Sequence, residues 1–542
     1  MQHLSHNRPS KRNTRRGPSH RLKTNLLHFA ALLLIALMPR IGWAQTQVTA
    51  STFSTLKSYL ESTTDYTIIL DSDVTWDDTF DITVRGTKTL RSSSGNKTIS
   101  RKEGNQVSSI VLMDGASLTV TNIIFDGDSV PNCASMILVE RDDTDSLYAA
   151  ASLTMTNCTI KDCILNYGMD LPAPPSTPGN YHYIRSFSGA AINFSPSNRT
   201  GTNTSNPRNI QLTNCVFDNN RVTKLSGPDD AEDINGINAL DKLYCNGGAI
   251  GIGDAIGAGS HITSCTFTNN KAAQGGGALY FENTLNEVQV IGCTIGTQNN
   301  PNTAGTNSGG SCVIQAKGGS GGGIYFAGGK VKFKNTKIEH NLAYYYGGGI
   351  YIAQSQSIKF VTGDYNNSIS NNIVADSITP ANSDAFGGGI YVKDDNGIAG
   401  VDIQYTNIYS NKAFRGGGIY VRGQTHQPAP VFSYCNIGSE NNGNEATANG
   451  GGIYLYGSQA KFYNCNIQYN YTAETTVSYH GTGGGIYKSA NTTAEDQQLF
   501  QGCDISYNGC QGSTTKTIQG GGVYIEYKNH CNGDYQDRKA HV

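Results

Sequence analysis

The sequence predicts an all-β fold, a single right-handed parallel β-helix in which short coils stack along one axis. Glycine accounts for 64 of the 542 residues and charged residues for only 15%, which disfavours a helical or coiled-coil protein. A phrase of three glycines followed by Ile or Val and then Tyr recurs through the second half of the chain. It alternates with a second phrase, a large apolar residue followed three positions later by Asn. Such internal repetition is typical of a solenoid.

The glycine phrase marks one strand of each coil. It begins at Gly321, Gly347, Gly387, Gly416, Gly450, Gly483 and Gly520. The closest copies lie 26 residues apart and others are more widely spaced, so we expect loops to be inserted at one corner. Each unit contains short alternating strands bounded by Gly or Asn, and none is long enough to bury a face alone. Stacking equivalent strands in parallel and in register provides that burial, with two or three strands per coil.

The second phrase supplies a polar turn residue to each coil. Its copies are Phe217/Asn220, Phe267/Asn270, Ile338/Asn341, Ile369/Asn372, Ile408/Asn411, Ile467/Asn470 and Ile505/Asn508. Asparagine tolerates the left-handed backbone conformation, and stacked Asn amides can hydrogen-bond along the axis of a parallel stack. Glycine allows positive φ and the close packing of one coil on the next. We therefore expect columns of Asn and Gly along the axis.

The first 44 residues are typical of an export signal. A basic stretch precedes an apolar run from Leu26 to Met38, and Gly42 and Ala44 occupy the positions that a signal peptidase reads. Cleavage between Ala44 and Gln45 removes 8 of the 40 Lys and Arg residues and none of the 42 Asp and Glu residues, which leaves a net charge near −10. This acidic balance disfavours a nucleic-acid partner. No later segment has the length and apolarity of a transmembrane helix.

The rest of the chain divides into three parts. Residues 45–187 are expected to form an N-terminal cap and irregular β-helix coils, with a short amphipathic helix over Thr52–Thr63 that caps the first coil. Residues 188–530 contain the glycine repeat, and residues 531–542 form a polar tail. No cap is evident after the last repeat, and an uncapped solenoid exposes a sheet edge. Two interpretations of this C-terminus therefore remain, a truncated reading frame and a natural stop.

The paired phrases resemble the repeats of the chlamydial-type polymorphic outer-membrane proteins. They stand as GGAI at Gly247–Ile250, FDNN at Phe217–Asn220 and FTNN at Phe267–Asn270, and the resemblance covers about residues 188–526. It implies a pectin-lyase-like β-helix of the autotransporter-passenger type, exposed at the bacterial cell surface or outer membrane and serving in adhesion. This sequence departs from that pattern because Ile replaces Phe in most later units, and because its polar C-terminal residues lack the alternating strands of a transmembrane barrel. The family's mode of anchoring is therefore not implied.

Thirteen cysteines in an exported chain raise the question of disulfides. Seven share one repeat position: Cys158, Cys215, Cys265, Cys293, Cys435, Cys465 and Cys503. We expect a buried column of thiols there, because neighbours in an in-register stack are poorly oriented for bridging. Six others lie off this column, where pairs are possible: Cys133, Cys163, Cys245, Cys312, Cys510 and Cys531. No Cys or His spacing fits a zinc site, and no cofactor is expected.

Three acidic groups are candidates for catalysis or calcium binding. They are Asp142/Asp143/Asp145, Asp229/Asp230/Glu232/Asp233 and Asp394/Asp395. Paired carboxylates can act as acid and base on a glycoside or bind calcium. Each group is contiguous in sequence, however, whereas we expect catalytic carboxylates of a solenoid to project from different coils. We therefore interpret these groups as solvated loops and assign no catalytic or metal-binding residue.

Tyrosine occupies one position of the glycine repeat. The column contains Tyr280, Tyr325, Tyr351, Tyr391, Tyr420, Tyr454, Tyr487 and Tyr524. Strand alternation directs these rings outward, where they can stack on sugars or dock a protein, or serve only to shield the sheet. The residues predicted to bind a ligand are Tyr325, Tyr351, Tyr391, Tyr420 and Tyr454. The long insertions Tyr167–Gly189 and Arg221–Asn246 form a second expected recognition surface.

Three functions are compatible with these observations. The leading hypothesis is an exported, surface-associated adhesin that binds a glycan or protein of a host or the environment. The alternative is a polysaccharide lyase or glycoside hydrolase, which needs carboxylates from different coils within about 10 Å of each other. A structural rod of the cell envelope is the third. The fold does not separate them, because one fold hosts many functions.

Overall fold

The computed structural model describes residues 45–78, 80–102, 109–112, 115–130, 134–139, 151–167, 187–194, 208–224, 245–253, 256–282, 284, 286–305, 319–353, 357–363, 366–374, 385–394, 400–423, 429–473, 481–489, 499–511 and 520–526. The predicted export segment at 1–44 and the polar tail at 531–542 lie outside these residues. Gln47–Val542 forms one compact unit. In the described part of the chain, no helix has the length and apolarity needed to cross a membrane.

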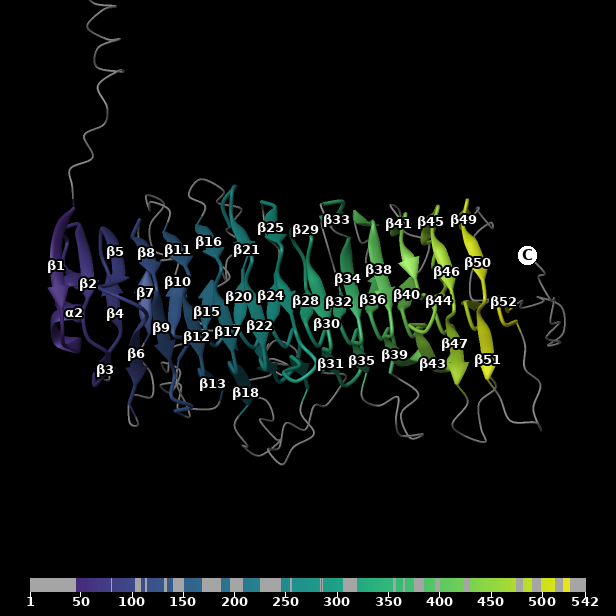
Figure 1. Ribbon diagram of the computed structural model, residues 1–542, viewed down its shortest axis with the longest axis horizontal. Helices are drawn as coiled ribbons and strands as arrows, with labels where there is room; N and C mark the ends of the chain where they lie inside the picture. Colours follow the sequence, from purple (N-terminus) through teal and green to yellow (C-terminus); the bar gives the residue numbers. More distant parts are fainter. Residues whose placement is uncertain are drawn as a thin grey trace, which may run out of the picture. The chain divides into compact units, whose positions relative to one another are not determined.

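Four long parallel sheets dominate the described residues, with the strands of successive coils side by side (Figure 1). Sheet A contains β1 (Thr46–Ala50), β2 (Tyr66–Leu70), β5 (Thr87–Ser92), β8 (Ser117–Thr121), β11 (Ser152–Thr156), β16 (Asn209–Thr213), β21 (His261–Thr263), β25 (Val288–Ile291), β29 (Lys330–Lys334), β33 (Ser357–Val361), β37 (Val401–Gln404), β41 (Val431–Ser433), β45 (Lys461–Tyr463) and β49 (Phe500–Gln501). Sheet B contains β3 (Val74–Trp76), β6 (Lys97–Arg101), β9 (Ile123–Asp126), β12 (Thr159–Lys161), β17 (Val216–Asp218), β22 (Thr266–Thr268), β26 (Thr294–Ile295), β30 (Lys337–Glu339), β34 (Asn367–Ser370), β38 (Thr406–Tyr409), β42 (Asn436–Ile437), β46 (Asn466–Gln468) and β50 (Asp504–Ser506).

The other two sheets complete each coil. Sheet C contains β4 (Ile82–Val84), β7 (Ile110–Leu112), β10 (Ile137–Val139), β15 (Ile192–Phe194), β20 (Ile250–Ile252), β24 (Leu279–Phe281), β28 (Ile324–Phe326), β32 (Ile350–Ile352), β36 (Ile390–Asp394), β40 (Ile419–Gly423), β44 (Ile453–Tyr456), β48 (Ile486–Ser489) and β52 (Val523–Ile525). Sheet D contains β13 (Ile164–Tyr167), β18 (Arg221–Lys224), β23 (Lys271–Ala272), β27 (Thr303–Ala304), β31 (Leu342–Ala343), β35 (Ile373–Val374), β39 (Lys412–Arg415), β43 (Glu445–Asn449), β47 (Tyr471–Ala473) and β51 (Gly509–Gln511). A separate short pair is formed by β14 (Phe187–Ser188) and β19 (Cys245–Asn246).

The chain passes through sheets A, B, D and C in that order, so a full coil has four strands. The predicted in-register stacking is confirmed, since Ile390 pairs with Ile419 and Tyr391 pairs with Tyr420. The expectation of two or three strands per coil was too low. Several strands of sheet D, such as β31 and β35, are only two residues long. A strand of that length leaves no alternating pattern in the sequence.

The glycine triplet forms the corner between sheets D and C. Gly347 has a φ of +62°, a conformation that favours glycine. A Cβ on Gly348 would lie 2.4 Å from the carbonyl oxygen of Gly388. A Cβ on Gly349 would lie 2.8 Å from the carbonyl oxygen of Gly389. The backbone conformation therefore requires the first glycine of the triplet, and the close approach of the next coil requires the other two.

The predicted asparagine column is a hydrogen-bonded ladder at the corner between sheets B and D. Its members are Asn220, Asn270, Asn302, Asn341, Asn372, Asn411, Asn444, Asn470 and Asn508. Each amide before the last donates to the next ladder oxygen at 2.8–3.0 Å. The members up to Asn470 are buried. The sequence pattern missed Asn302 and Asn444, because in those two coils Asn follows its Ile by seven positions instead of three.

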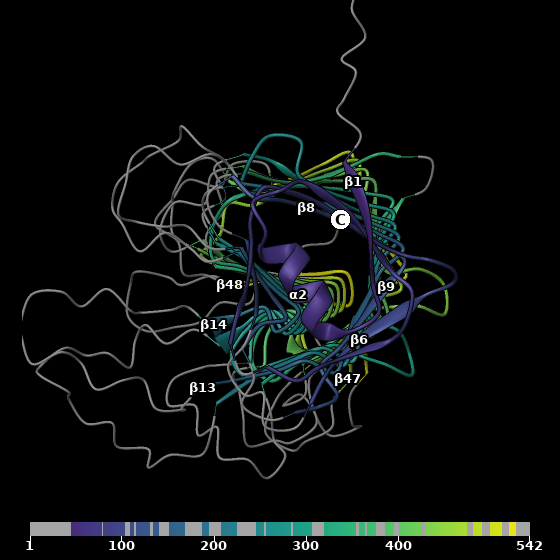
Figure 2. The same ribbon diagram turned by 90° about the vertical axis from the view of Figure 1, so that its left-hand side faces the viewer.

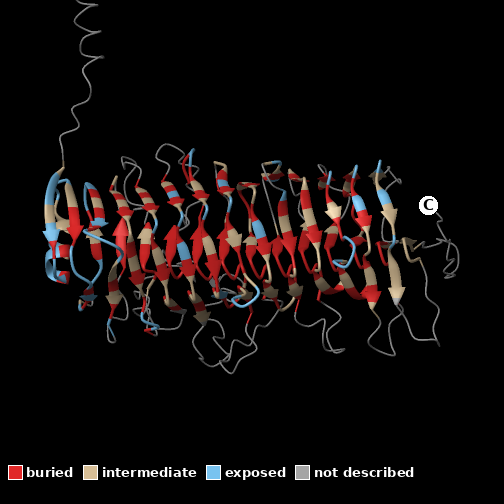
Figure 3. Ribbon diagram, in the orientation of Figure 1, coloured by how far each residue is buried: buried red, intermediate tan, exposed pale blue. Residues whose placement is uncertain are grey.

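The inward faces of the strands form one apolar core, and buried positions alternate with less buried ones along many strands (Figure 3). Equivalent rings stack from coil to coil inside it. The ring centroids of Phe217 and Phe267 are 4.9 Å apart, and those of Phe432 and Phe462 are 4.8 Å apart. Contact between identical side chains of successive coils fixes the register.

The predicted thiol column is confirmed. All seven of its cysteines are free, six of them are buried and Cys503 is half-buried. The hydrogen bond with Cys435, together with burial, raises the pKa of Cys465 to about 12, which keeps this thiol neutral. Off the column, Cys163 is buried and Cys510 is half-buried, and Cys245 lies in β19. The remaining off-column residues, Cys133, Cys312 and Cys531, lie outside the described residues.

The predicted N-terminal cap is α2 (Phe53–Glu61), which crosses the end of the first coil (Figure 2). Thr52 is its N-cap residue and accepts a hydrogen bond from the backbone N–H of Thr55, which satisfies an otherwise unpaired helix donor. Phe53, Leu56 and Leu60 are buried and belong to the apolar core. The apolar face of the helix thus closes the end of the solenoid core.

Candidate functional site

The tyrosine column predicted to bind a ligand points outward from the core but is covered. Tyr351, Tyr391, Tyr420 and Tyr454 have exposed fractions of 7, 1, 4 and 6%, and Tyr325 is half-buried. These rings belong to an apolar cluster separate from the main core. The prediction of an accessible stripe is therefore wrong for the four buried rings, and their burial fits the alternative of an aromatic ladder that shields the sheet.

For Tyr391 and Tyr420, the cover comes from aromatic residues just before the glycine triplets. The ring of Tyr346 lies 4.8 Å from that of Tyr391, and the ring of Phe386 lies 4.7 Å from that of Tyr420. Each covering ring therefore packs against the tyrosine of the next coil, tilted by 32° in the first pair and nearly parallel in the second. A bulky side chain directly before the triplet was the sequence signal for this cover, and the strand pattern alone gave no hint of it.

The acidic groups singled out in the sequence do not form a described site. Those at 142–145 and 229–233 lie outside the described residues, as does Asp395. Asp394 ends β36. In the described part of the chain, no group of three or more His, Cys, Asp or Glu side chains could hold a metal ion.

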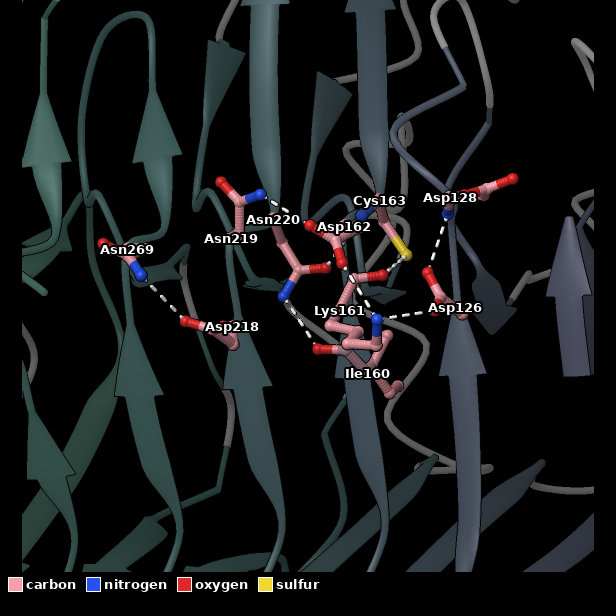
Figure 4. Close-up of polar contacts among 10 residues, drawn as sticks. All are labelled: Asp126, Asp128, Ile160, Lys161, Asp162, Cys163, Asp218, Asn219, Asn220 and Asn269. Atoms are coloured by element: carbon pink, nitrogen blue, oxygen red, sulfur yellow. Dashed lines mark hydrogen bonds and ion pairs between the residues drawn. The ribbon is translucent and has the colours of Figure 1, made fainter. Parts of the chain in front are cut away.

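Carboxylates from different coils do converge elsewhere, at the C-terminal ends of neighbouring strands of sheet B (Figure 4). Lys161 ends β12, and its Nζ lies 2.5 Å from Asp126 Oδ2 of the preceding coil and 3.1 Å from Asp162 Oδ2. Asn219 of the following coil donates to Asp162 Oδ1 at 2.6 Å. We call Asp126, Asp162 and Asp218 the carboxylate row. Since both Asp126 and Asp162 contact one nitrogen, they lie within the ~10 Å that a glycoside hydrolase requires.

Each carboxylate of this row has a polar or charged partner outside the row. Asp218 Oδ1 accepts hydrogen bonds from Thr268 Oγ1 at 2.7 Å and Asn269 Nδ2 at 3.1 Å. The hydrogen bond to Asp126 raises the pKa of Lys161 above its ordinary value, against the opposing effect of burial, and Asp162 adds to the rise. A lysine held in its protonated form cannot accept a proton, so a general base in this row would have to be a carboxylate.

A different outer surface lies on sheet B in the C-terminal coils. Asn407, Asn436 and Asn466 project outward from β38, β42 and β46 and form a second, solvent-facing amide row. Asn436 Nδ2 donates to Asn407 Oδ1 at 2.8 Å, and Asn466 Nδ2 donates to Asn436 Oδ1 at 2.9 Å. Asp504 continues the row on the next coil.

Two pairs of tyrosines flank this row at the corners of sheet B. Tyr405 and Tyr434, at the corner with sheet A, stack at 5.1 Å with an interplanar angle of 6°. Tyr469 and Tyr507, at the corner with sheet D, stack at 4.9 Å and 8°. Tyr434 and Tyr507 are 49% and 73% exposed. We call the two tyrosine pairs and the outer amide row together the amide–tyrosine face.

Sequence reasoning missed the amide–tyrosine face. Its tyrosines stand outside the glycine repeat, in the segments QYTNI, SYCNI, IQYN and ISYN. The sequence did carry a signal for this face. The corner residue with positive φ is Asn in other coils, as at Asn335 and Asn371, whereas it is Tyr in these four cases.

Comparison with known proteins gives one family match, to the Chlamydia polymorphic membrane protein repeat at residues 264–282. This segment runs from the corner before β22 to the residue that follows β24. No curated protein matches the chain.

Among solved structures, a PL6 alginate lyase in complex with a trisaccharide is 12% identical, covers 91% of this chain and 92% of its own, and has a TM-score of 0.35. A mannuronic acid-specific polysaccharide family 6 lyase from human gut microbiota is 12% identical, covers 80% of this chain and 88% of its own, and has a TM-score of 0.30. At these identities and TM-scores, neither similarity indicates an activity for this chain.

Proposed function

We propose that this protein is an exported, cell-surface-associated β-helix protein of the adhesin type, which binds a glycan or protein ligand without turning it over. The observation that best supports binding is the amide–tyrosine face. It combines exposed aromatic rings with side-chain amides on adjacent coils of a regular scaffold. Tyrosine offers a large contact area at low entropic cost. The polymorphic membrane protein repeat and the N-terminal segment with its predicted cleavage site support export.

Rigidity favours the binding interpretation. The buried asparagine ladder and the stacked core rings hold each coil against the next, so side chains of the outer face keep fixed spacings. Preorganised contacts lose little entropy on association. An outer face of this kind suits a ligand that extends over several coils.

The test uses the full chain expressed in a bacterial host, with the exported product recovered and its N-terminus sequenced. We expect the product to begin at Gln45. The product is then applied to immobilised, dye-labelled polysaccharides and to intact host cells, and both retained protein and released dye are measured. Retention without dye release is the expected result. Absence of retention on both surfaces would overturn the proposal and favour the structural rod.

Polysaccharide cleavage is the second candidate function, because Asp126 and Asp162 from adjacent coils lie within reach of one lysine. Release of soluble, dye-labelled fragments in the same assay would favour this candidate. The substitutions Asp126→Asn and Asp162→Asn should then abolish release. Asp71→Asn is the matched control, since Asp71 is an exposed carboxylate outside the carboxylate row. Unchanged release in both row variants would exclude the row as the active site.

A further inference from the structure

We propose that the amide–tyrosine face binds an uncharged glycan chain, laid across sheet B from one tyrosine pair to the other. This inference rests on the proposed binding function and names both the site and the ligand class. It involves tyrosines other than those of the glycine repeat, most of which are buried.

The backbone at the four tyrosines is the first reason. Tyr405, Tyr434, Tyr469 and Tyr507 have φ values of +46°, +53°, +58° and +55°. Bulky residues are rare in this left-handed region, and such outliers concentrate at functional sites.

The fold does not require tyrosine at these corners. Asn464, with φ +51°, occupies the corner one coil after Tyr434, and Ser410, with φ +53°, occupies the corner two coils before Tyr469. Small polar residues therefore serve the same backbone conformation in neighbouring coils. The backbone conformation at these corners therefore does not require an aromatic ring, and the rings are available for a ligand.

The rings are presented as fixed platforms. Each pair is nearly parallel, so each ring restricts the rotation of the other. Exposed, oriented aromatic rings suit the C–H faces of pyranose sugars, while the phenol hydroxyls can hydrogen-bond at the rim. A preorganised ring loses little freedom when a ligand stacks on it.

The amides between the pairs have spare hydrogen-bonding capacity. An Asn side chain has two N–H donors and an oxygen with two lone pairs. In the outer row, Asn436 uses one donor for Asn407 and one lone pair for Asn466. One N–H and one lone pair of Asn436 therefore remain for a ligand, which matches the paired donor and acceptor character of a sugar hydroxyl.

The spacing of the platforms sets the size of the ligand. Asn464 and Tyr469, at the two corners of one coil, are five residues apart. At a rise of about 3.3 Å per residue, the strip between the two corners is roughly 17 Å wide. A ligand that contacts both tyrosine pairs must therefore be an oligosaccharide chain and not a single sugar.

The charges around the face are mostly acidic, with Lys461 of β45 as a basic exception. Asp504 continues the outer amide row, Asp402 lies three residues before Tyr405, and the charge of Glu440 acts on Tyr469. Gln468 and Gln404 donate to Asp504 and Asp402 respectively and leave both carboxylates in place. Like charges repel across such a surface, so a polyuronate or sulfated chain is disfavoured and an uncharged chain is favoured.

The experiment measures binding of the full-chain protein to three soluble uncharged probes, a β-1,3-glucan, a mannan and chitohexaose, with alginate as the acidic probe. We expect at least one uncharged probe to bind at least tenfold more tightly than alginate. The double substitution Tyr434→Asn/Tyr507→Asn should weaken that binding at least tenfold, because it removes one exposed ring from each pair. Asn is chosen because it occupies equivalent corners in neighbouring coils.

Two matched variants keep the test specific. His340→Asn changes a ring to Asn at a left-handed corner, with φ +58°, outside the face, and should bind as the wild type does. Tyr434→Phe/Tyr507→Phe retains the rings and should bind within threefold of the wild type. Circular dichroism and thermal unfolding of all variants confirm that the fold is retained.

The failures are distinguishable. Equal binding by the double Asn variant, tighter binding to alginate, or no binding to any uncharged probe would each overturn the glycan proposal. Retention on host cells in that last case would leave the binding function standing and indicate a protein partner. Loss of retention on every surface would overturn the binding function itself.

Discussion

The outer faces of sheets C and B carry tyrosines in opposite situations. On sheet C, Tyr391 is 1% exposed beneath Tyr346 of the preceding coil. At the corners of sheet B, Tyr434 and Tyr507 are 49% and 73% exposed. Both groups stack from coil to coil at about 5 Å. Stacking along the axis is therefore common to both faces, and accessibility is what separates them.

The difference shows that an outward side chain is not necessarily an exposed one. The corner between sheets D and C places aromatic residues such as Phe386 over the neighbouring strand. Among the described residues, no such cover lies over the strands of sheet B in the coils of β38–β50, where amides and rings meet solvent. The same residue type therefore shields the fold on one face and is available for binding on the other.

The largest expected effect is loss of a covered ring. Tyr391→Ala should destabilise the protein by about 4 kcal/mol, because it removes a large buried side chain and leaves a cavity among stacked rings. Tyr391→Phe should cost less than about 1.5 kcal/mol, since volume and stacking are retained. The midpoint of denaturant unfolding measures both. An Ala variant as stable as the wild type would mean that the ladder does not stabilise sheet C.

The two amide rows provide the next comparison. Asn372→Ala in the buried ladder should cost about 3 kcal/mol, because Asn341 Nδ2 loses its acceptor at 3.0 Å and stays buried. Asn436→Ala in the outer row should cost at most about 1 kcal/mol, because water replaces the lost partners. Denaturant unfolding of both variants tests the difference. Equal losses would contradict the distinction between a structural and a solvent-facing row.

The dependence of stability on alkaline pH tests whether the tyrosines of sheet C are shielded from solvent. Burial raises the pKa of Tyr454 from 10.0 to about 12. The unfolded chain therefore loses this proton at lower pH than the folded chain does, and the stabilising contribution present below pH 10 is lost as pH rises from 10 to about 12. We expect stability to fall by about 2–3 kcal/mol over that interval.

Tyrosinate absorbance and unfolding curves measured against pH test this expectation. Tyr454→Phe should lessen the loss of stability, because phenylalanine has no ionisable hydroxyl. If every tyrosine of the folded protein ionised with the ordinary pKa of 10.0, the column would not be covered in solution.

The smallest effect is expected for an exposed corner ring. Tyr434→Asn should change stability by no more than about 1 kcal/mol, because relief of the left-handed conformation offsets the lost stacking with Tyr405. Thermal unfolding beside His340→Asn measures the difference. A loss as large as that of Tyr391→Ala would mean that Tyr434 is structural, and the binding interpretation of its position would lose its basis.

Much of the fold could be predicted from local pattern. The repeated Gly-Gly-Gly-Ile-Tyr phrase predicted a corner followed by an in-register strand, and Ile350, Ile390 and Ile419 do pair in one row. The spacing of the cysteines predicted a buried column of free thiols. The amphipathic segment at Thr52–Thr63 predicted the capping helix. In these cases the relevant partner of each residue is its own equivalent one coil away, so periodicity alone identifies it.

The candidate sites were less predictable. The acidic groups that drew attention in the sequence were contiguous, whereas the carboxylate row joins Asp126, Asp162 and Asp218 from three coils. No spacing in the sequence predicts that these three carboxylates lie close together, since the lengths of the intervening loops differ. Asn302 and Asn444 likewise belong to the buried ladder although their spacing in the sequence is irregular.

The sequence by itself determined the repeat, its register and the alternation of inward and outward side chains, because these follow from local backbone preferences and from stacking of like on like. Only the tertiary structure decided which outward side chains meet solvent. That outcome depends on which corner folds over which sheet, a relation between segments that no local preference encodes. Tyr420 in β40 and Tyr434 directly after β41 are 4% and 49% exposed for this reason.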